Sequence, residues 1–158
     1  MVRTSVLAAI LAASIGAAPT AAQEAPALTF ALGANSSGSF EGFAGWRGAP
    51  VWHGFQPTVG ASLSNRGEGW VGAGLAYTWR AAQQPGFLRV AVMPGLYRQG
   101  NGRNLGGAIE FRSSLEVGLR LRSGGEVALG VAHRSNAGIY NTNPGLNTAY
   151  LGYSMPLD

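Results

Sequence analysis

The chain has 158 residues, which is enough for one domain, and it has no cysteine, which excludes a disulfide framework and a thiolate metal site. Only 11% of its residues are charged, against about 25% in an ordinary soluble domain, and 25 are glycine. The eleven basic residues are all arginine and are scattered singly, which argues against nucleic-acid binding. The seven acidic residues are dispersed, so we expect neither a bound metal nor a cofactor.

The first 22 residues have the pattern of a signal peptide. A positive charge at Arg3 precedes an apolar run over residues 5–18, and small residues follow up to Gln23. A membrane anchor would need about 20 apolar residues, and no charged stop follows this run. The sequence therefore predicts a leader over residues 1–22 and one exported domain over residues 23–158. No later stretch is long and apolar enough for a spanning helix, so the domain could enter a membrane only as a closed barrel.

Eight segments of the exported domain alternate apolar and polar residues, as β-strands with two different faces do. The clearest runs from Ile109 to Leu121, with Phe111 and Val117 on one face and Glu110 and Arg120 on the other. The eight predicted strands are Leu28–Asn35, Phe40–Arg47, Gln56–Ser64, Trp70–Trp79, Phe87–Tyr97, Ile109–Leu121, Glu126–Ser135 and Asn147–Leu157.

Alternation alone does not separate a soluble sandwich from a membrane barrel. The polar faces are rich in glycine and in charges of both signs, which suits the packed lumen of an eight-stranded barrel. Trp70 and Trp79 lie at the two ends of one strand, which predicts two aromatic girdles. Together with the leader, these features predict an all-β fold, an eight-stranded antiparallel transmembrane β-barrel of the outer membrane. Residues 48–55 would form a periplasmic turn longer than usual.

The stretch that carries chemistry runs from His133 to Ile139 and continues with an Asn-Pro-Gly turn that leads to Asn147. A strand projects residues i and i+2 on one face, with Cα atoms about 6.5 Å apart, so His133 can reach Ser135. If the chain turns back after Ser135, Asn147 opens the returning strand beside both. This is the arrangement of a Ser-His-X triad, with a nucleophile, a base and a residue that orients the base.

The alternation also predicts where this triad lies. His133 and Ser135 share a face with Leu129 and Val131, and Asn147 shares a face with Leu151. We therefore expect all three on the outer, lipid-facing side of the barrel. With both termini periplasmic, they would lie at the extracellular end, level with the outer leaflet. Polar residues on a lipid face are costly and mark function.

The motif His-x-Ser-Asn-Ala-Gly-Ile, followed by Asn-Pro-Gly and a polar residue twelve positions after the serine, resembles that of the PagL-type lipid A 3-O-deacylases. The resemblance implies an outer-membrane hydrolase that acts on lipid A within lipopolysaccharide. It implies Ser135 as nucleophile and His133 as base, with Asn136, Asn143 and Gly145 supporting the site or its oxyanion hole. One position departs from the family pattern, which has a glutamate where this chain has Asn147.

Two functions stay open at this point. The first is a serine esterase that removes the 3-O-linked acyl chain of lipid A, surrounded by outer-membrane lipids and with no nucleic acid as partner. The second is a catalytically inactive barrel with a structural or adhesive role. Asn136 can serve either the oxyanion hole or the turn, and His53 is expected to be a loop residue. A homodimer is left open.

Overall fold

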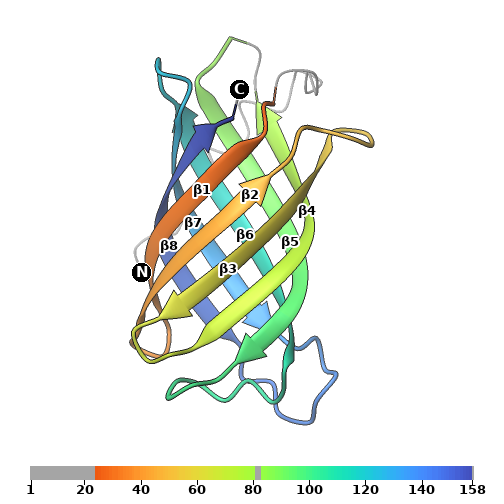
Figure 1. The fold of residues 1–158 in the computed structure, drawn as a ribbon, viewed down its shortest axis with the longest axis vertical. Helices are drawn as coiled ribbons and strands as arrows, with labels where there is room; N and C mark the ends of the chain where they lie inside the picture. Colours follow the sequence, from red (N-terminus) through yellow and green to blue (C-terminus); the bar gives the residue numbers. More distant parts are fainter. Residues whose placement is uncertain (1–23, 81–82, 158) are drawn as a thin grey trace, which may run out of the picture.

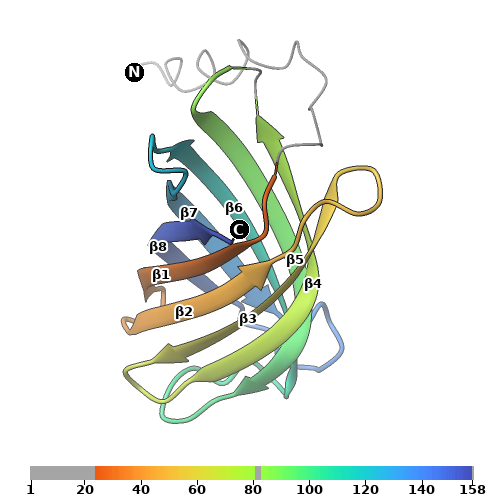
Figure 2. The same cartoon turned by 45° about the horizontal axis from the view of Figure 1, so that its top comes forward.

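The computed structural model describes residues 24–80 and 83–157, which form an antiparallel barrel (Figures 1 and 2). Each strand pairs with its neighbours in sequence, and β1 pairs with β8, so the sheet closes on itself. The strands are β1 (Ala27–Asn35), β2 (Phe40–Arg47), β3 (Phe55–Ser64), β4 (Gly69–Arg80), β5 (Gly86–Arg98), β6 (Ile109–Arg120), β7 (Glu126–Ser135) and β8 (Leu146–Pro156).

The eight predicted strands are confirmed, each to within one residue at either end. The predicted leader over residues 1–22 lies outside the described residues. Among the residues that are described, no helix is long and apolar enough to cross a membrane. We call the end where β1 begins and β8 finishes the terminal end, which is at the top of Figure 1, and the opposite end the distal end.

The period-two alternation of each strand separates the two faces of the wall. The outward positions carry aliphatic side chains that are exposed on the outer surface of the barrel, such as Leu129 at 66% and Leu151 at 61% exposure. The apolar outward face is continuous from strand to strand, because Leu129 of β7 pairs with Leu151 of β8, and Leu151 pairs with Leu32 of β1. An outer surface of exposed aliphatic side chains is the surface of a membrane barrel rather than of a soluble one.

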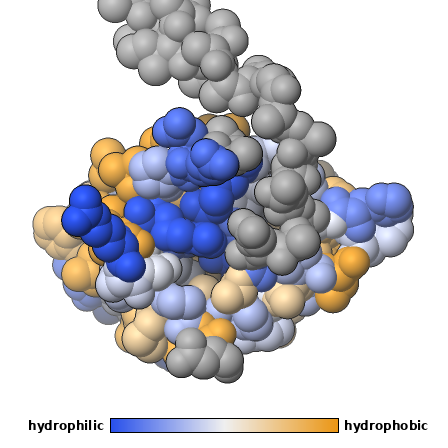
Figure 3. Space-filling view, turned by 90° about the horizontal axis from the view of Figure 1, so that it is seen from above, coloured by the Kyte–Doolittle hydropathy of each residue, from blue (hydrophilic) through white to orange (hydrophobic). Residues whose placement is uncertain are grey.

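The lumen near the terminal end is filled by charged side chains, which we call the terminal charge cluster. Glu126 lies at its centre and accepts hydrogen bonds from Arg89 at 2.6 Å and from Arg80 at 2.6 Å. Figure 3 looks onto this end and shows hydrophilic residues within a ring that contains many apolar ones. The full set is Glu24, Arg47, Arg80, Arg89, Glu116, Arg120 and Glu126.

Farther toward the distal end, the lumen holds an apolar cluster beside the guanidinium of Arg134. Trp70, Met93 and Leu146 pack together there with Tyr97 and Leu105. The prediction that Trp70 belongs to an aromatic girdle is wrong, because its side chain is only 3% exposed and its indole N–H donates to the carbonyl of Glu110. Trp70 instead packs in the buried core of the barrel.

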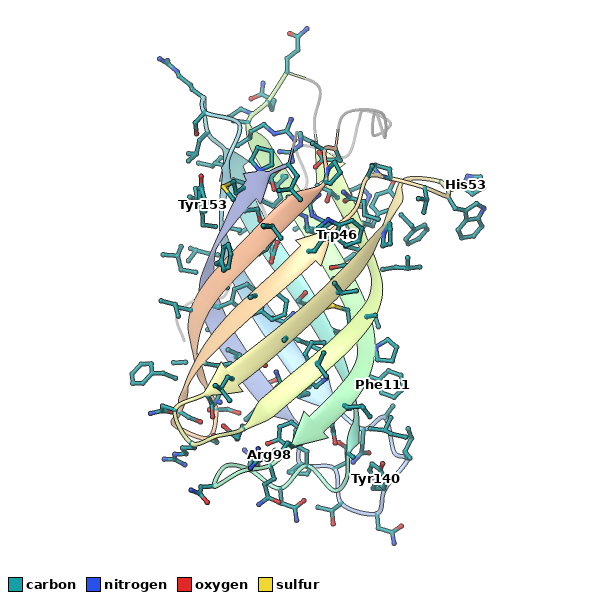
Figure 4. The ribbon with its side chains drawn as sticks, in the orientation of Figure 1. Trp46, His53, Arg98, Phe111, Tyr140 and Tyr153 are labelled. Atoms are coloured by element: carbon teal, nitrogen blue, oxygen red, sulfur yellow. The ribbon has the colours of Figure 1, made fainter. Side chains whose placement is uncertain are left out.

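Outward aromatic side chains do gather at the terminal end. Phe55, Tyr77 and Trp79 form a continuous series of ring contacts with Trp52 of the β2–β3 connection. That connection, residues 48–54, is long as predicted, and His53 projects from it away from the barrel (Figure 4). Aromatic rings at this level are typical of the interface between hydrocarbon and water.

Candidate active site

The orientation of the site begins with Arg134, which lies between His133 and Ser135 on β7 and points into the lumen. Its guanidinium donates to both carboxylate oxygens of Glu41, each at 3.2 Å, and to the hydroxyl of Ser62 at 3.0 Å. The arginine and the glutamate side chains are each only 3% exposed. Because successive side chains of a strand point to opposite faces, this buried pair directs His133 and Ser135 outward.

Polar side chains are scarce on the outer face of the wall, and they gather in one place. Apart from Arg98 and the ring-bearing tyrosines and tryptophans, the outward positions of the eight strands carry only four polar residues. These are Ser113 on β6, His133 and Ser135 on β7, and Asn147 on β8. The three strands are neighbours, and His133 pairs with Ser113 on one side and with Asn147 on the other. All four lie toward the distal end.

His133 and Asn147 form the predicted hydrogen bond. The Nδ1 atom of the imidazole lies 2.7 Å from Oδ1 of the amide. Since an amide oxygen only accepts, Nδ1 carries the proton and donates it to Asn147. Nε2 is then the bare nitrogen and can act as a base. The backbone N–H of Asn147 donates to the hydroxyl of Ser36 at 3.1 Å, which fixes the start of β8 against the β1–β2 turn.

Gly145 leaves room for the imidazole. A Cβ at this position would lie 2.8 Å from Cε1 and 3.5 Å from Nε2 of His133, and its φ of +64° also disfavours a side chain. Gly145 directly precedes Leu146, which pairs with Arg134, the residue before Ser135 on β7. The Cε1 and Nε2 edge of the ring therefore faces Gly145, at the turn that leads into β8.

Ser135 is half-buried and shares the outward face of β7 with His133. None of the hydrogen bonds within residues 24–80 and 83–157 joins its hydroxyl to the imidazole. Catalytic hydrogen bonds are often long or misaligned before substrate is bound, and rotation about one side-chain torsion can align a pair at i and i+2. The structure thus brings the two residues to one face without forming their bond.

Asn136 is fully buried and braces the two long loops at the distal end. Its Nδ2 donates to the carbonyls of Leu105 and Thr142, both at 2.7 Å, and its Oδ1 accepts from the N–H of Gly138 at 2.9 Å. Both N–H bonds of the amide are used, so the side chain is not free to donate to an oxyanion. Of its two predicted roles, the geometry favours the turn.

The turn that follows Ser135 is tight and strained. The N–H of Ile139 donates to the carbonyl of Asn136 at 3.0 Å, and Ala137 and Gly138 both have positive φ, +53° and +81°. These are the features of a type I′ turn, in which an alanine is uncommon. A strained backbone directly after a candidate nucleophile is a frequent feature of active sites.

The side-chain oxygen of Asn143 is anchored beside the candidate nucleophile, at the backbone of Asn136. Its Oδ1 accepts the backbone N–H of Asn136 at 3.2 Å, and within the described chain its Nδ2 has no hydrogen-bond partner. The side chain is exposed. An anchored oxygen with a free N–H₂ group suits a residue that donates to a developing oxyanion.

The sequence reading did not single out Ser113 or Ser36, although both lie beside the triad. Ser113 could have been found from the alternation of its strand, because it shares the outward face with Phe111 and Leu115. Its hydroxyl donates to the backbone carbonyl of His133 at 3.5 Å rather than to the ring. Ser36 lies in a turn 111 residues from Asn147, so only the closed barrel brings them together.

These residues line an open depression of about 640 Å³ on the outer surface. His133 and Asn147 form its polar side with Ser36 and Ser113. Its other side is apolar and includes Leu115, Val131 and Ala149. The depression thus has the candidate base at one edge and aliphatic side chains at the other, and Ser135 is not among the residues that line it. An apolar hollow beside a base suits the acyl chain of a lipid.

Comparisons with solved structures agree with the barrel fold. The crystal structure of the outer membrane enzyme PagL superposes with a TM-score of 0.73 at 20% identity, over 83% of this chain and 99% of that chain. A designed transmembrane β-barrel gives a TM-score of 0.61 at 13% identity, over 84% of this chain and 95% of that chain. Neisserial surface protein A gives 0.57 at 12% identity, over 84% and 94%.

Likeness at these identities shows the fold alone, and no curated protein sequence matches the chain. The sequence does match the lipid A 3-O-deacylase (PagL) family over residues 27–156, which is the whole barrel. The chain therefore belongs to the lipid A 3-O-deacylase family, a family of outer-membrane hydrolases.

Proposed function

We propose that this protein removes the 3-O-linked acyl chain of lipid A with Ser135 as nucleophile, His133 as general base and Asn147 as the residue that orients the base. The observation that carries the proposal is the gathering of polar side chains on an otherwise apolar outer wall. A histidine and a serine exposed to hydrocarbon cost free energy, so their presence together on neighbouring strand positions calls for a function.

The reaction is acyl transfer to water. Nε2 of His133 takes the proton of the Ser135 hydroxyl as its oxygen attacks the ester carbonyl. When the tetrahedral intermediate collapses, the bond to the sugar oxygen breaks, and the imidazolium protonates the leaving sugar alkoxide. The free Nδ2 of Asn143 is the side-chain donor to the oxyanion. Water, activated by the same imidazole, hydrolyses the acyl-enzyme and releases the fatty acid.

Asn147 supports this chemistry through orientation rather than charge. Its Oδ1 accepts from Nδ1 of His133 at 2.7 Å, which holds the tautomer that leaves Nε2 free. A neutral amide gives the imidazolium less electrostatic stabilisation than a carboxylate would. The third member of the site is therefore weaker than a glutamate would be at the same position.

The substrate reaches the site sideways. In this proposal the terminal end is periplasmic and the distal end extracellular, so the site lies at the level of the outer leaflet. Lipid A resides in that leaflet and can present its ester to the outward face of β7 without leaving the membrane. His133, Ser135 and Asn147 come from one chain, so the proposed reaction requires no second copy, and a homodimer stays open.

The test uses the full chain purified in detergent with lipopolysaccharide as substrate. Mass spectrometry of lipid A should show the loss of one hydroxyacyl chain with the parent protein and no loss with Ser135→Ala. Ser113→Ala is the matched control, because it removes the neighbouring outward hydroxyl of the same site. Intact lipid A after incubation with the folded parent protein would instead support a barrel without catalytic activity.

A further inference from the structure

The distribution of charge over the barrel is sharply asymmetric. None of the six acidic residues in residues 24–80 and 83–157 is exposed, since they line the lumen or lie buried under a turn. They are Glu24, Glu41, Glu68, Glu110, Glu116 and Glu126. Five arginines pair with them inside the barrel, namely Arg47, Arg80, Arg89, Arg120 and Arg134. The charges left on the surface of the described chain are therefore all positive.

Three of these remaining arginines lie at the distal end. Arg66 is in the β3–β4 turn, Arg98 ends β5 on its outward face, and Arg103 is in the β5–β6 loop. Within the described residues none of them forms an ion pair. Figure 4 shows Arg98 at the same end of the barrel as Phe111 and Tyr140.

Backbone and side-chain contacts hold the three arginines on one braced surface. The N–H of Asn101 donates to the carbonyl of Arg66 at 2.9 Å, which joins the β3–β4 turn to the β5–β6 loop. Arg98 pairs across the sheet with Gly69, the residue after that turn. The hydroxyl of Tyr97 donates to the carbonyl of Arg103 at 2.7 Å.

One carboxylate lies beneath this surface, and it does not neutralise the arginines by pairing. Glu68 accepts from the backbone N–H of Arg103 at 2.8 Å and from the hydroxyl of Ser39 at 2.9 Å. Its other partners are Asn35 at 3.5 Å and Tyr97 at 3.4 Å. All of these donors are neutral groups. The Arg66 guanidinium donates through Nη1 to the carbonyl of Ser37 at 3.1 Å, and within the described residues its other N–H groups and the guanidinium groups of Arg98 and Arg103 are left for a ligand.

The braced surface also continues into the active site. The β5–β6 loop that carries Arg103 is bound two residues later, where the carbonyl of Leu105 accepts from Asn136 at 2.7 Å. Asn136 follows Ser135 directly in the chain. A ligand that reaches from the catalytic serine along this loop would meet guanidinium groups.

We propose that Arg66, Arg98 and Arg103 form a binding surface for the phosphate groups of the outer-leaflet glycolipid whose ester Ser135 attacks. Guanidinium groups bind phosphate in a bidentate manner, and each cationic side chain near an anionic membrane surface adds to the affinity. The proposal rests on the proposed function for the identity of the lipid. It adds the part of the headgroup that is recognised and the residues that recognise it.

The experiment measures binding in the full chain carrying Ser135→Ala, so that hydrolysis does not enter. The probe is a fluorescent lipid A with two phosphates in detergent micelles, compared with the same lipid A after removal of both phosphates. Arg66→Gln, Arg98→Gln and Arg103→Gln together should weaken binding of the phosphorylated lipid about tenfold or more and reduce its dependence on salt. Binding of the phosphate-free lipid should not change.

Arg122→Gln is the matched control, because Arg122 is an exposed arginine in the turn at the terminal end, and it should bind like the parent. Arg98→Gln alone keeps the test decisive if the triple variant fails to fold, since its side chain has no hydrogen-bond partner in the described chain. We expect a loss of about threefold for it. Equal binding of both lipids by the parent, or equal loss in Arg122→Gln, would overturn the proposal.

Competition with inorganic phosphate distinguishes a site for the lipid headgroup from a site for the free phosphate ion. Millimolar phosphate should compete weakly with the phosphorylated lipid, and complete displacement by it would show a site for the free ion and contradict the proposal. The outcome is independent of the catalytic claim. A parent protein that binds lipid A through its phosphates and never cleaves it would contradict only the proposed function, and cleavage with phosphate-independent binding would contradict only this inference.

Discussion

The inner and outer faces of this barrel use polar residues in opposite ways. In the lumen, charged side chains are numerous and pair with one another, as Glu126 does with Arg47, Arg80 and Arg89. On the outer wall, polar residues are few, and the four that are not tyrosine, tryptophan or arginine lie side by side on β6, β7 and β8. From this difference we infer that polar residues inside the barrel stabilise the fold, whereas those outside it serve the proposed chemistry.

The largest effect should follow from removing the outward base. His133→Ala should lower the rate of lipid A deacylation by roughly 10⁴-fold or more, because the base is lost while the inward anchor Arg134 remains. The chain offers a matched control in its other histidine, His53, which lies in the β2–β3 connection at the terminal end. His53→Ala should deacylate at the parent rate. A similar loss of deacylation rate in both variants would contradict the view that the polar residues of the outer wall serve catalysis.

Removing an inward charge should affect stability instead. Arg134→Met leaves Glu41 buried without its partner, which should lower the free energy of unfolding by about 3–5 kcal/mol. Urea unfolding of the barrel in detergent measures this. Adding Glu41→Leu to the same chain should restore much of the loss, because the uncompensated charge is then removed as well. A double variant that is less stable than Arg134→Met would argue against this explanation.

A change to the third triad residue should be smaller and favourable. Asn147→Glu supplies a carboxylate to the imidazolium at the position where the family pattern has glutamate, and we expect deacylation about tenfold faster. Asn147→Ala should be slower than the parent, because nothing then fixes the tautomer of His133. An equal or lower rate in Asn147→Glu would contradict the role given to Asn147.

The smallest effect concerns pH and the carboxyl group under the arginine surface. Burial by itself would raise the pKa of Glu68, but hydrogen bonds from the Arg103 N–H, Ser64, Ser39 and Asn35 outweigh burial and hold the pKa below its usual 4.5. Glu68 therefore contributes stability that is present above pH 4.5 and is lost as the pH falls through the lowered value.

Thermal unfolding of the parent and of Glu68→Gln between pH 7 and pH 3 measures this contribution. The parent should be more stable at neutral pH, and the difference between the two proteins should shrink in acid. A difference that stays constant across the range would show that the ionisation of Glu68 does not support the distal loops.

Much of the fold could be read from the sequence because period-two alternation determines strands and faces without any long-range information. The same alternation could have placed Trp70 correctly. Trp70 lies on the same face of β4 as Gly72 and Thr78, which point inward. The prediction of an aromatic girdle rested only on the position of Trp70 at the end of the strand. The partners that cross the lumen, such as Arg134 and Glu41, are 93 residues apart, and no local pattern identifies them.

The site was predictable to the extent that it is local. His133 and Ser135 lie two residues apart, and the turn after them returns the chain to Asn147, so their common face followed from spacing. The role of Asn136 did not, because its partners Leu105 and Thr142 belong to two different loops. Ser36 and the arginine surface likewise depend on loops that meet only in the closed barrel.

The central claim is that Ser135, and not another outward hydroxyl, forms the acyl-enzyme. A fluorophosphonate ester, which modifies activated serines covalently, tests it when peptide mass spectrometry locates the adduct. We expect the adduct on Ser135 in the parent and in Ser113→Ala, and strongly reduced labelling in His133→Ala. An adduct on Ser113, or labelling of Ser135 that does not depend on His133, would contradict the account.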